Sequence, residues 1–150
     1  MKKNINELEI IYCFRKFREL HKDSIWLVCK RFDLSVYEAD ILTFLSNNPK
    51  YDLASQISYF RLLPKASVSQ AIFSLLKRGL ITSKRDKSDR RRLHLFITDS
   101  AGEIIAGLEN AENTFWSRVF SGFTDEEMDN VSALIAKLEK NLDNRERRKV

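Results

Sequence analysis

The sequence predicts a mostly α-helical chain with one small β-hairpin, and three observations point to this fold class. Apolar residues recur at three- and four-residue steps over most of the chain, which is the period of an amphipathic helix. Four glycines and two prolines are too few for a loop-rich β-sandwich. Only residues 80–98 change to strand-like alternation. With 150 residues, 43% of them hydrophobic, we expect a single domain over residues 1–150.

The first expected helix covers residues 4–32, where apolar and charged residues recur at helical spacing and no glycine or proline intervenes. A helix of more than about 25 residues is longer than a small globular core requires. Its length therefore predicts that this helix packs against a partner chain.

The next helix has clear start and stop signals. Ser35, followed three residues later by Glu38, has the pattern of a capping box, in which each side chain binds the other residue's backbone amide. Asn47-Asn48-Pro49 is expected to end this helix. A short helix over about residues 52–60 and a tight connection at residues 61–63 follow.

A further helix is expected over residues 64–78. Pro64 suits the first helical position, where its missing N–H has no intrahelical partner, and Gly79 is a natural stop. One face of this helix is apolar and points to the core, and the opposite face is polar with Phe73 at its margin. The core face holds Val68, Ile72 and Leu75, and the polar face holds Ser67, Gln70, Ser74 and Lys77.

Residues 80–98 predict a β-hairpin with a charged tip. Residues 80–82 and the alternating residues 92–98 are the strand candidates, and the basic run between them is expected to be the turn. Residues 77–92 carry eight Lys or Arg against two Asp. The net charge of this segment is +6 (eight minus two), which exceeds the net charge of +5 of the whole chain. Such a patch suggests a polyanionic partner, nucleic acid first and an acidic membrane surface second.

Two more helices are expected to close the chain. One covers about residues 100–120, with apolar residues at helical spacing. The other begins with a second capping-box pattern, Thr124 and Glu127, and runs to about residue 146.

The two short helices and the hairpin together make a winged helix-turn-helix over residues 35–98. A helix fits the major groove of B-DNA, where base edges are distinguishable, and a hairpin beside it can send an arginine into the negative minor groove. An ordinary amphipathic surface helix and a solvated charge run are the alternatives. The position of the basic run, directly after the polar-faced helix, favours DNA recognition.

Individual residues of this region have expected roles. Gln70 can make paired hydrogen bonds to adenine, and Lys65, near the start of its helix, suits a phosphate. Asp89 and Arg91 lie two residues apart across the turn, so the carboxylate can brace the guanidinium through charge-assisted hydrogen bonds.

These residues resemble the MarR family of winged helix-turn-helix transcriptional regulators, over about residues 35–105. The family's wing pattern D-x-R and the apolar-Thr pair after it are present as Asp89, Arg91 and Ile97-Thr98. The recognition-helix pattern K-x-x-V-S and the Gly-Leu pair that follows are present as Lys65, Val68, Ser69 and Gly79-Leu80.

The resemblance implies an obligate homodimer that reads a near-palindromic operator in double-stranded DNA. Residues 4–32 and 100–146 would form its dimerisation region, and Arg91, held by Asp89, would enter the minor groove. The chain departs from the family at positions 70 and 74, which are frequently basic there, and at Pro64, where a Ser or Asp cap is common. The candidate DNA-binding residues are Lys65, Ser67, Ser69, Gln70, Ser74, Lys84, Arg85, Lys87, Asp89, Arg90 and Arg91.

Other ligands leave weaker signals. Relatives in this family often bind small aromatic effectors in the crevice between the dimer helices and the DNA-reading region. Cys13 and Cys29 would be about 24 Å apart on one straight helix, which is too far for a disulfide between them. We expect both to be small buried apolar residues, and the alternative, by analogy with relatives that sense oxidants through cysteine, is a redox sensor. His21 and His94 have no metal-ligand spacing and no catalytic motif is present, so we expect no metal, no cofactor and no enzyme.

No apolar stretch approaches the roughly 18 residues of a membrane span and no secretory signal is seen, so we expect a cytoplasmic protein without a membrane partner. The expected function is that of a sequence-specific DNA-binding transcriptional regulator. We expect a dimeric repressor of nearby genes that a small-molecule or redox effector releases. A winged-helix protein-interaction module and a non-specific architectural DNA binder are the two alternatives.

Overall fold

The computed structural model describes the backbone of residues 6–146 and the side chains of residues 6–142. The chain divides into two compact units, Met1–Trp116 and Ser117–Val150. The predicted fold class is confirmed, because the described elements are helices, one short 3₁₀ turn and a two-stranded antiparallel hairpin.

The first helix, α1 (Glu7–Arg31), begins at Asn6, whose side chain accepts a hydrogen bond from the Leu8 amide at 3.0 Å. The predicted start at residue 4 lies outside the described residues. Only Ile25 and Cys29 of this helix are buried, and its apolar first half is largely exposed. In this unit, α1 therefore contributes to the core mainly through its last turns.

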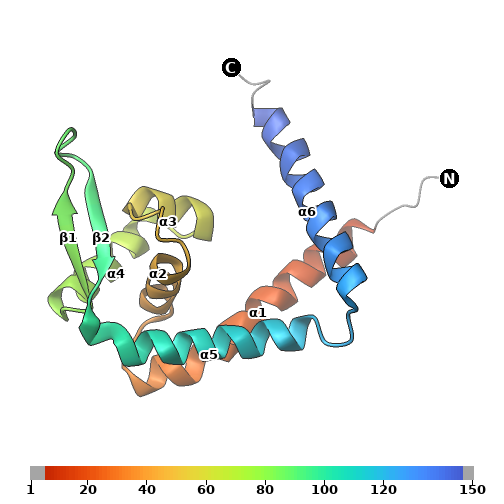
Figure 1. Cartoon of the computed structure of the whole chain (residues 1–150), viewed down its shortest axis with the longest axis horizontal. Coiled ribbons are helices and arrows are strands. Elements are labelled where there is room, and N and C mark those ends of the chain that lie inside the picture. The colour runs from red at the N-terminus through yellow and green to blue at the C-terminus, as the bar shows by residue number, and fades with distance from the viewer. Residues whose placement is uncertain (1–5, 147–150) are drawn as a thin grey trace. The chain divides into compact units, whose positions relative to one another are not determined.

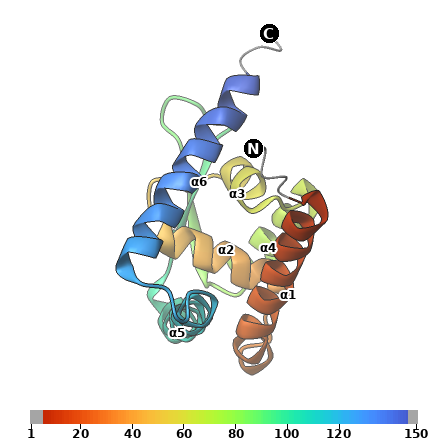
Figure 2. The same ribbon diagram turned by 90° about the vertical axis from the view of Figure 1, so that its right-hand side faces the viewer.

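The capping box at the start of α2 (Val36–Asn47) is confirmed. The Ser35 amide donates to Glu38 Oε2 at 2.7 Å, and the Glu38 amide donates to Ser35 Oγ at 3.2 Å. Most of α2 is buried, and it lies across the middle of the first unit with α3 and α4 on one side and α5 on the other (Figure 2). This helix is the central support of the fold.

The helix-turn-helix consists of α3 (Ala54–Arg61) and α4 (Lys65–Lys77) (Figure 1). Pro64 caps α4 and does not form its first turn as predicted, because its ψ of 133° is extended and only its carbonyl joins the helix, accepting from the Val68 amide. In the turn between the helices, Leu62 adopts the left-handed region with φ 53°. The Ser58 hydroxyl fixes this turn by donating to the Leu63 carbonyl at 2.7 Å.

The backbone conformation of Leu62 predicts a stabilising substitution. A non-glycine residue in this region costs about 1–2 kcal/mol, and the Leu62 side chain, 80% exposed, contributes little burial in return. We expect Leu62→Gly to raise the free energy of unfolding by about 0.5–1 kcal/mol, since glycine's greater chain entropy offsets part of the gain. Urea denaturation at fixed protein concentration measures this. Leu62→Ala is the control, because it keeps the strain, and equal stability of both variants would contradict the explanation.

The end of α4 follows the predicted glycine stop. Gly79 has φ 67°, its amide donates to the Leu76 carbonyl, and the Leu80 amide donates to the Leu75 carbonyl. These two bonds form a Schellman motif, which also brings together the buried side chains of Leu75 and Leu80. The motif sets the direction in which the chain enters the hairpin.

The hairpin, called the wing below, pairs β1 (Ile81–Arg85) with β2 (Leu93–Ile97), Ile81 opposite Ile97 and Arg85 opposite Leu93. Strand β1 is longer than predicted, so Lys84 and Arg85 belong to the strand and not to the turn. A one-residue third strand was missed by sequence reasoning. Leu53 pairs with His94, and the Leu95 amide donates to the Asp52 carbonyl at 2.9 Å.

After β2, a 3₁₀ turn (Asp99–Ala101) leads into α5 (Gly102–Val119), which buries Ile104, Leu108 and Phe115. The second unit contains α6 (Asp125–Glu146), and its predicted capping box is confirmed. The Thr124 amide donates to Glu127 Oε2 at 2.9 Å, and the Glu127 amide donates to Thr124 Oγ1 at 3.3 Å. None of the described helices combines the length and apolar character needed to span a membrane.

Candidate nucleic-acid interface

The outer face of α4 is exposed and contains no acidic residue. Its core face is as predicted, with Val68, Ile72 and Leu75 buried. The structure moves Phe73 from the margin to the exposed face itself, where it is 69% exposed. Ser67 and Ser74 lie at the half-buried edges. The exposed side chains along this face are Lys65, Ser69, Gln70, Phe73 and Lys77.

The hydroxyl of Ser74 forms a hydrogen bond within the protein. Its hydroxyl donates to Glu38 Oε1 at 2.8 Å, and Arg78 Nη1 lies 3.5 Å from the same oxygen. Burial acts to raise the pKa of Glu38, but hydrogen bonds from Ser35 and Ser74 outweigh it and hold the pKa below its ordinary value. This ionised carboxylate ties α4 to α2, and it leaves the Ser74 hydroxyl turned away from the exposed face.

The turn of the wing, residues 86–92, is organised around one carboxylate. Asp86 Oδ1 accepts from the Ser88 amide at 2.7 Å, the Ser88 hydroxyl at 2.6 Å and the Asp89 amide at 2.8 Å. These bonds, with the Ser88 hydroxyl foremost and His94 next, hold the pKa of Asp86 far below its usual range. The Asp86 amide also donates to the Arg92 carbonyl, which closes the turn.

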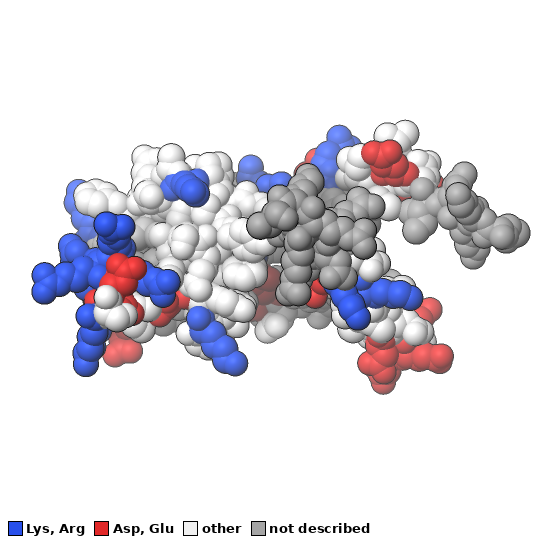
Figure 3. Space-filling view, turned by 90° about the horizontal axis from the view of Figure 1, so that it is seen from above, with Lys and Arg blue, Asp and Glu red and all other residues white. Residues whose placement is uncertain are grey.

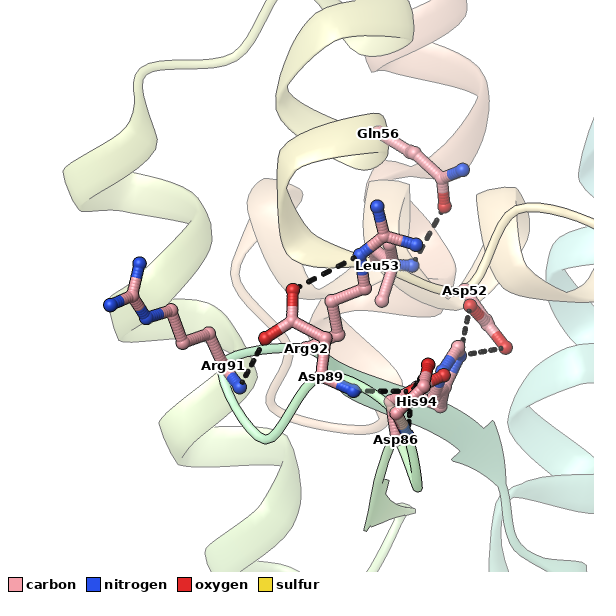
Figure 4. Close-up of polar contacts among 9 residues, drawn as sticks. Asp52, Leu53, Gln56, Asp86, Asp89, Arg91, Arg92 and His94 are labelled. Atoms are coloured by element: carbon pink, nitrogen blue, oxygen red, sulfur yellow. Dashed lines mark hydrogen bonds and ion pairs between the residues drawn. The ribbon is translucent and has the colours of Figure 1, made fainter.

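Asp89 holds Arg91 in a way that sequence reasoning did not predict. Its Oδ1 accepts from the backbone amide of Arg91 at 3.0 Å, and its Oδ2 lies 3.7 Å from Nε of Arg92. The Arg91 side chain extends away from this carboxylate (Figure 4). The predicted brace between Asp89 and the Arg91 guanidinium is therefore corrected to a main-chain contact, because an Asp side chain readily reaches the amide two residues ahead in a turn.

Basic side chains gather around the tip of the wing, while the surface beside it is mostly uncharged (Figure 3). Arg85 Nη1 donates to the Arg90 carbonyl at 3.2 Å and so supports the turn from β1. The predicted basic residues of this group are all exposed, namely Lys84, Arg85, Lys87, Arg90 and Arg91. The structure thus brings the cationic tip and α4 into one unit, where β1 packs against α4 (Figure 1).

His94 makes two side-chain contacts that the sequence does not predict. Its Nδ1 lies 2.8 Å from Asp52 Oδ1, and its Nε2 lies 3.0 Å from Asp86 Oδ2 (Figure 4). No local pattern signals this arrangement, since Asp52 is 42 residues away in the chain. Within the described residues, no cluster of three His, Cys, Asp or Glu could hold a metal ion.

A cavity of about 400 Å³ lies between α2 and α5. One of its walls is the carboxylate of Glu112, which pairs with His21 Nε2 and accepts from Trp116 Nε1 at 3.2 Å. Burial acts to raise the pKa of Glu112, but the bond to His21 outweighs it, so the pKa lies below its ordinary value. The other lining residues include Thr43, Ser46, Ile105 and Leu108.

The two cysteines differ in environment. Cys13 is exposed, which differs from the reading of both as buried residues, whereas Cys29 is buried. Burial raises the pKa of the Cys29 thiol. A protonated, buried thiol reacts slowly with oxidants.

Comparison with known proteins agrees with these features. A sequence model of the MarR family matches residues 32–92, from the end of α1 to the turn of the wing. The structure of a MarR protein from Peptoclostridium difficile is 27% identical and superposes with a TM-score of 0.73, covering 97% of this chain and 94% of that one. The chain thus resembles MarR-family proteins in sequence over residues 32–92 and has the winged-helix fold of their solved structures.

Two further solved structures share the fold. MepR of Staphylococcus aureus, solved as a complex with DNA, is 19% identical with a TM-score of 0.68, covering 87% of this chain and 96% of that chain. BpsR of Bordetella bronchiseptica, whose DNA binding is regulated by 6-hydroxynicotinic acid, is 16% identical with a TM-score of 0.66 and covers 87% of this chain and 98% of that chain. The segment matched by the MarR-family model contains every candidate DNA-binding residue.

Proposed function

We propose that this protein is a transcriptional regulator of the MarR family that binds double-stranded DNA, with α4 in the major groove and the tip of the wing at the adjacent minor groove. The observation that carries the proposal is that one structural unit presents both an exposed face of α4 without acidic residues and a cationic tip of the wing. Both features suit a polyanion with two grooves of different width.

The exposed residues divide by chemistry. Gln70 can hydrogen-bond adenine in the major groove, and Ser69 beside it can contact several base edges. Arg91 extends into the minor groove from a turn that Asp89 fixes through the backbone. Lys65 and the remaining cations of the tip bind phosphates, which give affinity and register without sequence information. Ser67 lies at a half-buried edge of α4 and remains a peripheral candidate, and Ser74 contributes by fixing α4 to Glu38.

Homodimerisation is supported by apolar side chains that remain exposed within each unit. On α1 these include Leu8, Ile11 and Phe14, and on α6 they are Leu134, Ile135, Leu138 and Leu142, each more than half exposed. Such helix faces are covered when two chains associate. Two copies present two α4 helices, which suits a pseudo-palindromic operator with half-sites about one helical turn apart.

The cavity between α2 and α5 supports regulation by a small molecule. Its volume falls in the range of ligand sites, and it combines apolar side chains, the Trp116 ring and a few polar groups. An aromatic effector bound there would favour a dimer with wrongly spaced α4 helices, so that the repressor leaves the DNA of nearby genes. The regulation of BpsR by an aromatic acid supports this mechanism by analogy.

Fluorescence anisotropy across a salt series tests the proposal. The protein is titrated against the DNA upstream of its own gene and against a shuffled duplex of equal length and composition. We expect tighter binding to the upstream DNA, with log affinity falling linearly with log salt at a slope of about −0.9 per phosphate contacted. Equal binding to both duplexes would favour the architectural role, and no binding by a folded dimer would favour a protein-interaction module.

A further inference from the structure

One imidazole ring joins the turn of the wing to the start of α3. His94 lies in β2 and is half-buried, and its Nδ1 lies 2.8 and 2.9 Å from the two oxygens of Asp52. Its Nε2 lies 3.0 Å from Oδ2 of Asp86. Asp52 directly precedes the Leu53 cap of α3, while Asp86 begins the turn, so the ring connects two segments that the hairpin ladder does not connect (Figure 4).

The number of N–H groups on the ring decides how many of these contacts exist. A neutral imidazole has one N–H and one acceptor nitrogen, so it can donate to only one of the two carboxylates, and its other nitrogen then faces a carboxylate lone pair. The imidazolium form donates to both. Only the imidazolium form can make hydrogen bonds at both of these short distances, 2.8 Å to Asp52 and 3.0 Å to Asp86.

Asp86 transmits this state to the DNA-contacting tip. One of its oxygens faces His94, and the other accepts from the amides of Ser88 and Asp89. Asp89 in turn holds the Arg91 amide. A change at the ring thus reaches Arg91 through two carboxylates within a single turn.

The other charged groups near the ring do not favour its protonation, because each of them either pairs with another side chain or is itself positive. On β1, Lys84 stands directly across from His94, and its positive charge acts against protonation of the ring. From α2, which also packs against β2, Glu38 faces Arg78 and Asp40 faces Arg61. Asp52 and Asp86 are therefore the two carboxylates that directly contact the ring.

On the basis of the proposed DNA binding, we propose that His94 is a positioning residue. As an imidazolium it links the turn of the wing, through Asp86, to Asp52 at the start of α3, and loss of a proton breaks this link while the main-chain pairing of β2 with Leu53 remains. Hydrogen bonds from the ring to Asp86, and then to Asp52, raise the pKa of His94 above its ordinary value. A raised pKa means that the bridge is complete at low pH and is lost as pH rises through that pKa. We therefore expect DNA affinity to be higher at low pH and to fall as pH rises through the pKa of His94.

The chain has two histidines, which gives the experiment a matched control. DNA affinity is measured by anisotropy between about pH 6 and pH 9, at fixed salt, for wild type, His94→Gln and His21→Gln. The duplex is one selected from random DNA by the wild-type protein. We expect affinity to fall about fivefold with rising pH for wild type and His21→Gln. The His94→Gln protein should bind at the weaker level throughout. A pH-independent wild type, or a His94→Gln protein with the wild-type profile, would overturn the proposal.

A second readout without DNA separates this inference from the proposed function. In ¹⁵N-labelled protein, the backbone amides of Asp89 and Arg91 should titrate with the midpoint of the His94 ring, and they should lose this midpoint in His94→Gln. If these amides do not follow the ring, the bridge does not position the tip, and the inference fails whatever the DNA affinity. If they follow it while no DNA is bound specifically, the proposed function fails and the coupling stands.

Discussion

Replacing Leu138 with aspartate is expected to convert the protein from dimers to monomers and to reduce operator affinity by at least about 100-fold. Leu138 is 61% exposed on α6, among the apolar residues that we place in the dimer interface. A buried carboxylate without a partner strongly opposes association. A monomer also loses the second α4 and hence the gain from binding two half-sites at once.

Sedimentation velocity gives the oligomeric state and anisotropy gives the DNA affinity. Ala136→Asp is the matched control, because it introduces the same charge on the opposite side of the same exposed helix. The control should remain dimeric and bind DNA as wild type does. A dimeric Leu138→Asp protein with unchanged affinity would exclude this face of α6 from the interface.

Arg91→Ala is expected to weaken binding to the selected operator by about 5- to 150-fold, the range for losing a contact worth about 1–3 kcal/mol. The backbone of Arg91 is held by Asp89, so the chain from which the side chain extends is already ordered and loses little further entropy on binding. A guanidinium is favoured where the minor groove is narrow, and the loss should therefore be greatest on operators with A·T-rich flanks.

Two other arginines make the comparison specific. Arg90→Ala removes a neighbouring cation of the same tip and should weaken binding less, with the salt slope reduced by about one phosphate contact. Arg118→Ala, at the end of α5 and outside the wing, should leave affinity unchanged. If Arg90→Ala and Arg91→Ala reduce affinity equally on every sequence, Arg91 binds a phosphate and not the minor groove.

The sequence predicts best what depends on neighbouring residues. Both capping boxes, at Ser35 and Thr124, and the glycine stop after α4 were predicted, because each involves groups within six positions of one another. Helical periodicity also predicted the buried face of Val68 and Leu75. These features are encoded by local geometry, so one sequence is enough to find them.

The missed features depend on tertiary packing or on fine backbone angles. The pairing of Leu53 with β2 and the contact between Asp52 and His94 join segments that are about forty residues apart, and nothing local encodes them. The sequence also singles out Asp89, but periodicity cannot tell whether its carboxylate reaches an amide or a guanidinium. Pro64 fits both the cap and the first turn of a helix, and its ψ alone distinguishes them.

The position of α2 has a thermodynamic consequence. At one end Glu38 of α2 holds Ser74 of α4, and at the other end Thr43 and Ser46 line the cavity next to α5. A molecule in the cavity and an operator on α4 therefore act on the same rigid element. By thermodynamic reciprocity, if the molecule lowers the affinity for DNA by some factor, DNA lowers the affinity for the molecule by the same factor. Under the regulation that we propose, the free protein therefore binds the molecule more tightly than the protein bound to its operator does.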